Sequence, residues 1–163
     1  MHPNRELLDR FFTALNRHDA DAMAACYTPD AHFRDIAFDR KGRDRIHEMW
    51  RMICSGDIQA DCEIDHADAA SGAAHSTFTY HFGASKEPPS PGRPVINPIK
   101  STFTFRDGLI AKQEDYCNPH AWARQAIGTG PAGFLAGHLR WLRSRKAEAK
   151  VVAFLKSNRR ARV

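Results

Sequence analysis

Two aspartates, Asp35 and Asp115, stand where the alternation of a β-strand calls for an apolar side chain. Asp35 falls on the same predicted face as Ala31 and Phe33, and Asp115 shares a face with Gln113. Burial disfavours the charged form of a carboxyl group, so the pKa rises toward neutrality, where the group can act as a general acid or base. Two such groups close together split in pKa, leaving one protonated donor and one charged acceptor. The pair therefore predicts acid/base chemistry.

Other candidates and other interpretations stand beside this pair. Asp35 could instead cap the turn that follows it or pair with a buried arginine. His47, at the edge of the predicted cavity, is either an auxiliary proton-transfer group or a boundary histidine satisfied by a local partner. Ser101 has no histidine partner that spacing reveals, which argues against a nucleophile.

Three helices are predicted in the N-terminal third. Apolar residues recur at helical spacing over residues 5–16 and 43–54. Asp19 can cap a second helix that runs to about Tyr27. Thr28-Pro29-Asp30 predicts a turn, and the strand that leads to Asp35 follows it from Ala31.

Four further strands are predicted at 59–67, 74–82, 99–105 and 109–117, the last entered through an Asp107-Gly108 hairpin. The segment between the strands at 74–82 and 99–105 is predicted to form an extended loop, because its prolines forbid a regular ladder. A short helix over 120–127 and a longer one after Pro131 complete the pattern. The prolines of the loop are Pro88, Pro89, Pro91, Pro94 and Pro98.

The string LNRHDADAMAACYTPDAHFRD, from Leu15 to Asp35, resembles the opening of a nuclear transport factor 2-like domain. SnoaL-like polyketide cyclases, limonene-epoxide hydrolases and ketosteroid isomerases share that fold. The resemblance runs from about Glu6 to Ile127 and implies an α+β fold, in which a cone-shaped, curved, mixed or antiparallel sheet wraps on three N-terminal helices. It also implies a homodimer across the open sheet face.

Individual residues match these relatives unevenly. Asp35 falls where ketosteroid isomerases keep their general base. Phe11 falls on their oxyanion-hole tyrosine and cannot donate a hydrogen bond. Asp115, in EDYCNP, resembles the acid of the D-Y-F-D string of the hydrolases and the acid/base aspartate of the cyclases, but Asn118 replaces the second aspartate of that string. The resemblance thus implies a fold and an acid/base site without one specific reaction.

A sheet curled around helices leaves a hollow in which a small molecule can bind. An aromatic lining suits a small apolar, ring-bearing ligand, although aromatic residues also dominate ordinary core packing. The predicted lining beside the two aspartates consists of Phe11, Phe33, Trp50, Phe78, Tyr80, Ser101, Phe103 and Gln113.

The basic charge of the chain is concentrated near its C-terminus. Of 24 basic and 19 acidic residues, nine basic and one acidic lie from His138 onward. We expect a domain over residues 1–130 and a basic helical extension over 131–163 that packs on it through Leu135, Leu139 and Leu142. Alternatively, the extension is an interaction module for an acidic partner or an anionic surface. Sequence-specific nucleic-acid binding is not expected, because stacking aromatics are lacking there beyond Trp141.

Other function classes are disfavoured by composition. The 163 residues suit one domain, and no apolar run approaches the ~20 residues of a transmembrane helix, so a cytoplasmic protein is expected. The cysteines, far apart and without C-x-x-C spacing, predict free thiols, with no metal and no cofactor. They are Cys26, Cys54, Cys62 and Cys117.

We therefore expect a SnoaL-like pocket protein that performs cofactor-free isomerase, cyclase or hydrolase chemistry on a small apolar substrate. Asp35, Asp115 and His47 are its candidate catalytic residues. A non-catalytic domain that binds a hydrophobic metabolite is the alternative, so whether the chain is an enzyme stays open.

Overall fold

The structure, a computed structural model, describes residues 2–84 and 89–160. Within these residues, the strands belong to a single sheet. In chain order the elements are α1 (Pro3–Asn16), α2 (Ala20–Ala25), β1 (Tyr27–Arg34), β2 (Asp39–Lys41), α3 (Arg43–Cys54), β3 (Gln59–Ala67), β4 (Ser71–Phe82), β5 (Arg93–Arg106), β6 (Leu109–Tyr116), α4 (Pro119–Ala126), α5 (Pro131–His138) and α6 (Arg140–Arg160).

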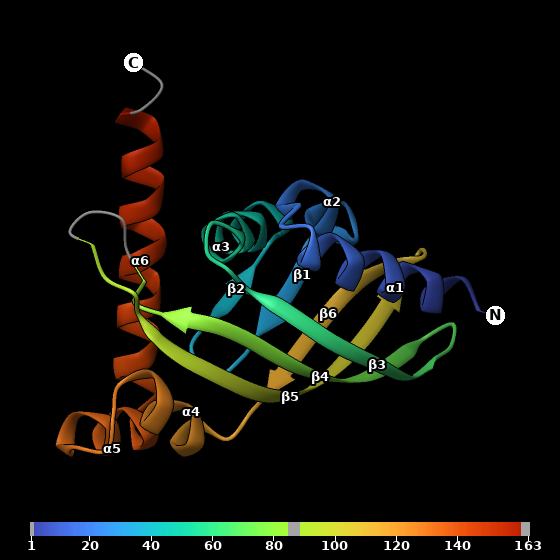
Figure 1. The fold of residues 1–163 in the computed structure, drawn as a ribbon. Coiled ribbons are helices and arrows are strands. Elements are labelled where there is room, and N and C mark those ends of the chain that lie inside the picture. The colour runs from blue at the N-terminus through green and yellow to red at the C-terminus, as the bar shows by residue number, and fades with distance from the viewer. Residues whose placement is uncertain (1, 85–88, 161–163) are drawn as a thin grey trace.

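The strands form one curved sheet in the order β2-β1-β6-β5-β4-β3. All neighbouring strands are antiparallel except β1 and β6, which are parallel. Helices α1, α2 and α3 cover one face, and α6 stands across one end of the sheet (Figure 1). Irregular registers in the β1–β6, β3–β4 and β5–β6 pairs help to curl the sheet. The predicted α+β fold, with its mixed curved sheet, three N-terminal helices and additional C-terminal helix, is confirmed.

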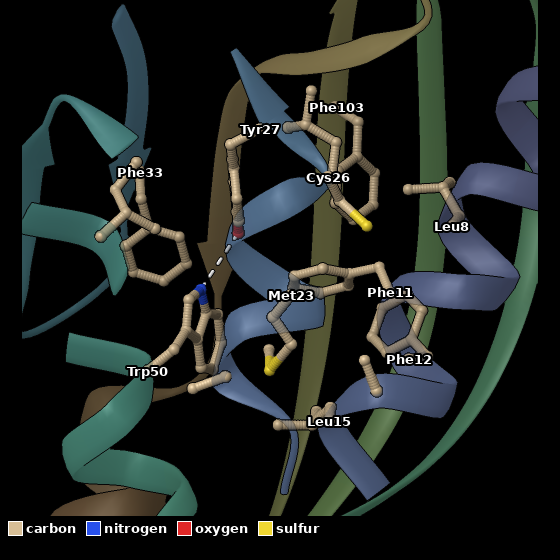
Figure 2. Packing of buried hydrophobic residues seen from close by; sticks show 14 of the residues in the cluster. Leu8, Phe11, Phe12, Leu15, Met23, Cys26, Tyr27, Phe33, Trp50 and Phe103 are labelled. Carbon is tan, nitrogen blue, oxygen red and sulfur yellow. Dashed lines mark hydrogen bonds between the residues drawn. The ribbon is translucent and has the colours of Figure 1, made fainter. Parts of the chain in front are cut away.

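Aromatic side chains fill the space between the helices and the sheet. The Phe11 ring lies edge-on to Phe12, Tyr27 and Trp50, with ring centroids 5.2, 5.7 and 5.7 Å apart (Figure 2). Phe33 packs on the Trp50 indole at 5.6 Å. Edge-to-face contacts of this kind add to the stabilisation from apolar burial. The interior at this point is a close-packed core.

The region before Asp35 differs from the prediction. Asp19 caps α2 by accepting the Ala22 N–H (2.9 Å), as expected, but the helix ends at Ala25. The predicted turn at residues 28–30 is wrong, because these residues belong to β1. The parallel pairing of Tyr27 with Ile110 of β6 extends this strand toward the N-terminus, a long-range contact that local turn propensity cannot reveal. The three-residue strand β2 was not predicted.

Prolines at positions 94 and 98 do not exclude a ladder, contrary to the prediction. Both lie in β5 and pair with β4, whereas the register with β6 begins only at Lys100. The first half of β5 is thus a free edge. Ile96 donates its N–H to Gln125 Oε1 (2.9 Å) and accepts from Gln125 Nε2 (3.0 Å), so its backbone faces away from β4. In a strand, the backbone N–H groups of alternate residues face the same side. The N–H groups that Pro94 and Pro98 lack would therefore have faced the free edge, as that of Ile96 does, and the ladder with β4 loses no donor. Residues 85–88 of the predicted loop lie outside the described residues.

The C-terminal extension forms two helices instead of the predicted single one. Leu139 has an extended backbone, with φ −103° and ψ 94°, and interrupts the helical conformation between α5 and α6. Leu135 was expected to pack on the body, but 48% of its surface is exposed. Buried Val151 and Arg143 are among the α6 residues that contact the body, and the side chain of Leu142 lies outside the described residues. None of the helices in the described ranges combines the length and the apolar character needed to cross a membrane.

Candidate functional site

Asp115 lies at the end of a hydrogen-bond chain that begins in the aromatic core. The Trp50 indole N–H donates to the Tyr27 hydroxyl (3.3 Å), which donates to Gln113 Oε1 (2.5 Å). The first of these bonds is drawn in Figure 2. Gln113 Nε2 then donates to both oxygens of Asp115 (3.0 and 3.1 Å). The chain fixes the orientation of the Gln113 amide, so its donors face the carboxyl group.

Burial sets the protonation behaviour of Asp115. Desolvation raises its pKa to about 7, and the negative charge of Asp35 acts in the same direction. Gln113 and Ser101 oppose the rise. Ser101 lies directly across the β5–β6 register from Asp115, although its buried hydroxyl makes no hydrogen bond of good geometry. Near neutral pH, Asp115 can therefore both give and accept a proton.

Asp35 follows β1 and closes the turn formed by residues 35–38. Its Oδ1 accepts the backbone N–H groups of Ala37 (2.6 Å) and Phe38 (2.5 Å), so the capping interpretation of this residue holds. Burial nevertheless raises its pKa to about 6, against the lowering effects of those two bonds and of Arg140 and Arg143. Asp35 thus has a structural role and a perturbed protonation equilibrium together.

The fold brings Asp35 and Asp115 into one electrostatic environment. Both side chains are partly buried, and the charge of Asp35 affects the pKa of Asp115. Tyr80, on β4, accepts a hydrogen bond from the Trp122 indole N–H (2.8 Å), and burial raises its pKa to about 12. Burial likewise raises the pKa of Cys117 to about 11, so neither group supplies an anion at neutral pH. The two aspartates are the groups that can exchange protons there.

The predicted lining divides into two groups. Tyr80, Ser101 and Gln113 lie among the polar groups around the aspartates. The predicted aromatic lining belongs mostly to the core, because the rings pack against one another and against α1 and α3. Its members are Phe11, Phe33, Trp50, Phe78 and Phe103.

His47 is not brought to the aspartates. Its Nε2 lies 2.6 Å from Asp21 Oδ1 of α2, which agrees with the local-partner interpretation. Nothing in the described part of the chain connects its ring with Asp35 or Asp115 by a hydrogen bond or a charge effect.

Several residues of the site were not expected. Tyr27 was predicted to end a helix, and its strand assignment depends on the pairing with β6. Trp122 of α4 and the arginines Arg140 and Arg143 of α6 reach the site from distant parts of the sequence. Only Trp122 carries a local signal, as a large aromatic on a short amphipathic helix.

Two surface hollows lie elsewhere. One, of about 380 Å³, is on the outer face of the sheet beside Glu63, Lys100 and Tyr116. Another, of about 500 Å³, lies where α1 meets α2, beside Arg17 and Arg51. Neither is lined by the two aspartates.

The arrangement does not resemble a metal centre. Within residues 2–84 and 89–160, no three histidine, cysteine or carboxylate side chains are grouped so as to hold a metal ion. The four cysteines are free thiols in the structure. The chemistry that these side chains can support directly is proton transfer between carboxyl groups and a bound molecule.

The raised pKa values predict how stability depends on pH. The folded state holds protons on Asp35 and Asp115 up to about pH 6 and 7, whereas the ordinary pKa is 3.8. Their contribution to stability is complete below about 3.8 and is lost as the pH rises to about 7. Asp115→Asn removes one of these groups, so its thermal midpoint relative to wild type should be higher at about pH 8 than at about pH 5. Thermal unfolding of both proteins at both pH values measures this. The same difference between the two thermal midpoints at both pH values would contradict the prediction.

Residues 8–113 match the family model of the SnoaL-like domain, and the chain therefore belongs to the SnoaL-like domain family. A protein from Silicibacter sp. TM1040, assigned as a polyketide cyclase, is 26% identical, with a TM-score of 0.64 over 75% of this chain and 93% of that one. Another protein so assigned, from Xanthomonas campestris pv. campestris, is 22% identical, with a TM-score of 0.67 over 76% and 96%. An LEH-like epoxide hydrolase from M. tuberculosis is 19% identical, with a TM-score of 0.60 over 77% and 90%. No curated protein matches the chain significantly in sequence.

Proposed function

We propose that this protein is a cofactor-independent acid/base enzyme that acts on a small apolar, ring-bearing molecule, in an isomerisation, cyclisation or hydrolysis. One observation carries the proposal: Asp35 and Asp115 are both partly buried, burial raises both pKa values toward neutrality, and the charge of Asp35 adds to the rise at Asp115. Structures assigned as polyketide cyclases and an epoxide hydrolase with the same fold support the class of reaction.

The two aspartates would have different roles. Asp115 is held by an amide on one side and is the better candidate for the group that transfers the proton. Asp35 has one oxygen occupied by two backbone donors, so we assign it the role of charged partner that adds to the rise that burial produces in the pKa of Asp115. When Asp35 is ionised, Asp115 is more readily protonated and can donate to a developing oxyanion or leaving group.

Proton abstraction beside a carbonyl group can be tested without knowing the natural substrate. The purified protein is incubated in D₂O with a panel of small cyclic ketones, diketones and lactones, and NMR follows deuterium entry at the α-carbon. A parallel panel of cyclic epoxides in ¹⁸O-labelled water tests ring opening. Exchange or opening above the buffer rate, lost on boiling, is expected. Failure of both panels, at several pH values around neutrality, would contradict the acid/base proposal.

A non-catalytic binding domain is the second candidate. The capping bonds of Asp35 and the close packing of the predicted lining favour it. Binding of panel members without exchange or opening, detected as NMR shift changes at Tyr80 and Trp122, would support this function over catalysis.

A further inference from the structure

The C-terminal helix α6 reaches back to the turn that carries Asp35. Arg143 is only 8% exposed, and its guanidinium donates to three backbone carbonyl groups. Its Nε lies 3.0 Å from Ile36 O, and its Nη1 lies 2.5 Å from Ala136 O and 3.0 Å from Gly137 O. A buried arginine with three such bonds joins the helix, the segment before it and the turn into one unit.

The turn formed by residues 35–38 is held from two sides. On one side, the Asp35 carboxylate accepts the N–H groups of Ala37 and Phe38, and the Asp35 N–H donates to Phe38 O (3.0 Å). On the other side, Arg140 Nη2 lies 3.4 Å from both Asp35 O and Phe38 O, and Arg143 binds the carbonyl between them in sequence. The position of the Asp35 carboxylate is therefore coupled to α6.

We propose that Arg143, assisted by Arg140, is a positioning residue of the candidate site: its guanidinium fixes the 35–38 turn and so holds the Asp35 carboxylate beside Asp115. The inference rests on the proposed function for the meaning of that site. It assigns to α6, which lies beyond the residues matched to the family, a part in the site itself.

The charges around Asp35 agree with this role. The groups that face it are Asp115 of β6, Tyr80 of β4, Cys117, and the two arginines of α6. Among them, only the arginines favour the ionised form of Asp35. Removing either cation should move the pKa of Asp35 upward, and losing the three carbonyl bonds should loosen the turn.

The test uses the full chain and needs no substrate. ¹³C NMR of the aspartate carboxyl carbons, with the Asp35 signal assigned through Asp35→Asn, gives its titration midpoint, and amide exchange at Ala37 and Phe38 reports on the turn. We compare Arg143→Met and Arg143→Lys with Arg145→Met, which changes an exposed arginine of the same helix.

Arg143→Met should raise the Asp35 midpoint and speed amide exchange at residues 37 and 38 by about tenfold or more. Arg143→Lys keeps the positive charge but lacks the forked donors of the guanidinium group. The titration midpoint of Asp35 should therefore lie nearer the wild-type value, while amide exchange at residues 37 and 38 should remain as fast as in Arg143→Met. Arg145→Met should match wild type in both. Wild-type values of both quantities in Arg143→Met would overturn the proposal.

If Arg143→Met does not fold, Arg140→Met provides the same comparison at a partly exposed residue. It should shift the Asp35 midpoint in the same direction, and an unchanged midpoint with unchanged exchange would refute the role of α6. These readouts are independent of turnover. Failure of the exchange and epoxide panels would end the proposed function without deciding this inference.

Discussion

Asp115→Asn is expected to lower the turnover of any substrate found by the exchange or epoxide panels by about 10²–10⁴-fold. An amide of the same shape cannot ionise, so the group whose pKa lies near 7 is lost as a proton donor and acceptor. The Asn side chain can still accept from Gln113, and the fold should be retained. The ratio kcat/KM of both proteins across the pH range from about 5 to about 9 measures the effect.

Asp61→Asn is the matched control for this substitution. Asp61 lies on an exposed position of β3, at the outer face of the sheet, and lines the 380 Å³ hollow there. Its kcat/KM should equal that of wild type. Turnover by Asp115→Asn at the wild-type rate would move the proton-transfer role to another group, and equal losses in both variants would indicate an unspecific effect.

Phe11→Ala should lower the free energy of unfolding by about 3–5 kcal/mol. The ring is fully buried and contacts three other aromatic rings, so truncation leaves a cavity among side chains that cannot close around it. Urea unfolding followed by tryptophan fluorescence gives the value. This prediction separates a core residue from a pocket residue, because truncating a ring that lines an open hollow would lower the free energy of unfolding much less.

Phe134→Ala provides the comparison on the surface. Phe134 is 64% exposed on α5, and its loss should change the free energy of unfolding by no more than about 0.5 kcal/mol. A change in Phe11→Ala as small as this, with altered ligand binding, would return Phe11 to the lining of a pocket.

Sequence patterns predicted the elements that have strong local periodicity. The apolar spacing of RDRIHEMWRMIC gave both ends of α3, and the alternation around Asp115 placed this residue and Gln113 on one face, where they form a hydrogen bond. The Asp107-Gly108 turn has φ values of +54° and +71°, as the two-residue hairpin signal predicted. In these segments, local preference and tertiary packing agree.

The features that were missed depend on contacts far apart in the sequence. Tyr27 becomes a strand residue because Ile110 pairs with it, and Pro94 is tolerated because β6 does not extend beside it. The carbonyl contact of Arg143 spans 107 positions, and a basic helix alone does not indicate where it docks. The composition of the C-terminal extension predicted its positive charge correctly, but it did not predict that Arg143 binds the turn that carries Asp35.

The amide of Gln125 imitates a neighbouring strand along the open side of β5, since it offers Ile96 both an acceptor and a donor. Exposed edge strands can pair with strands of other molecules. The Gln125 side chain occupies the backbone N–H and C=O groups of Ile96 that such a strand would use. We therefore expect this one glutamine of α4 to limit edge-to-edge association of the folded protein, and the neighbouring prolines, which lack an N–H group, to remove further hydrogen-bond donors from the same edge.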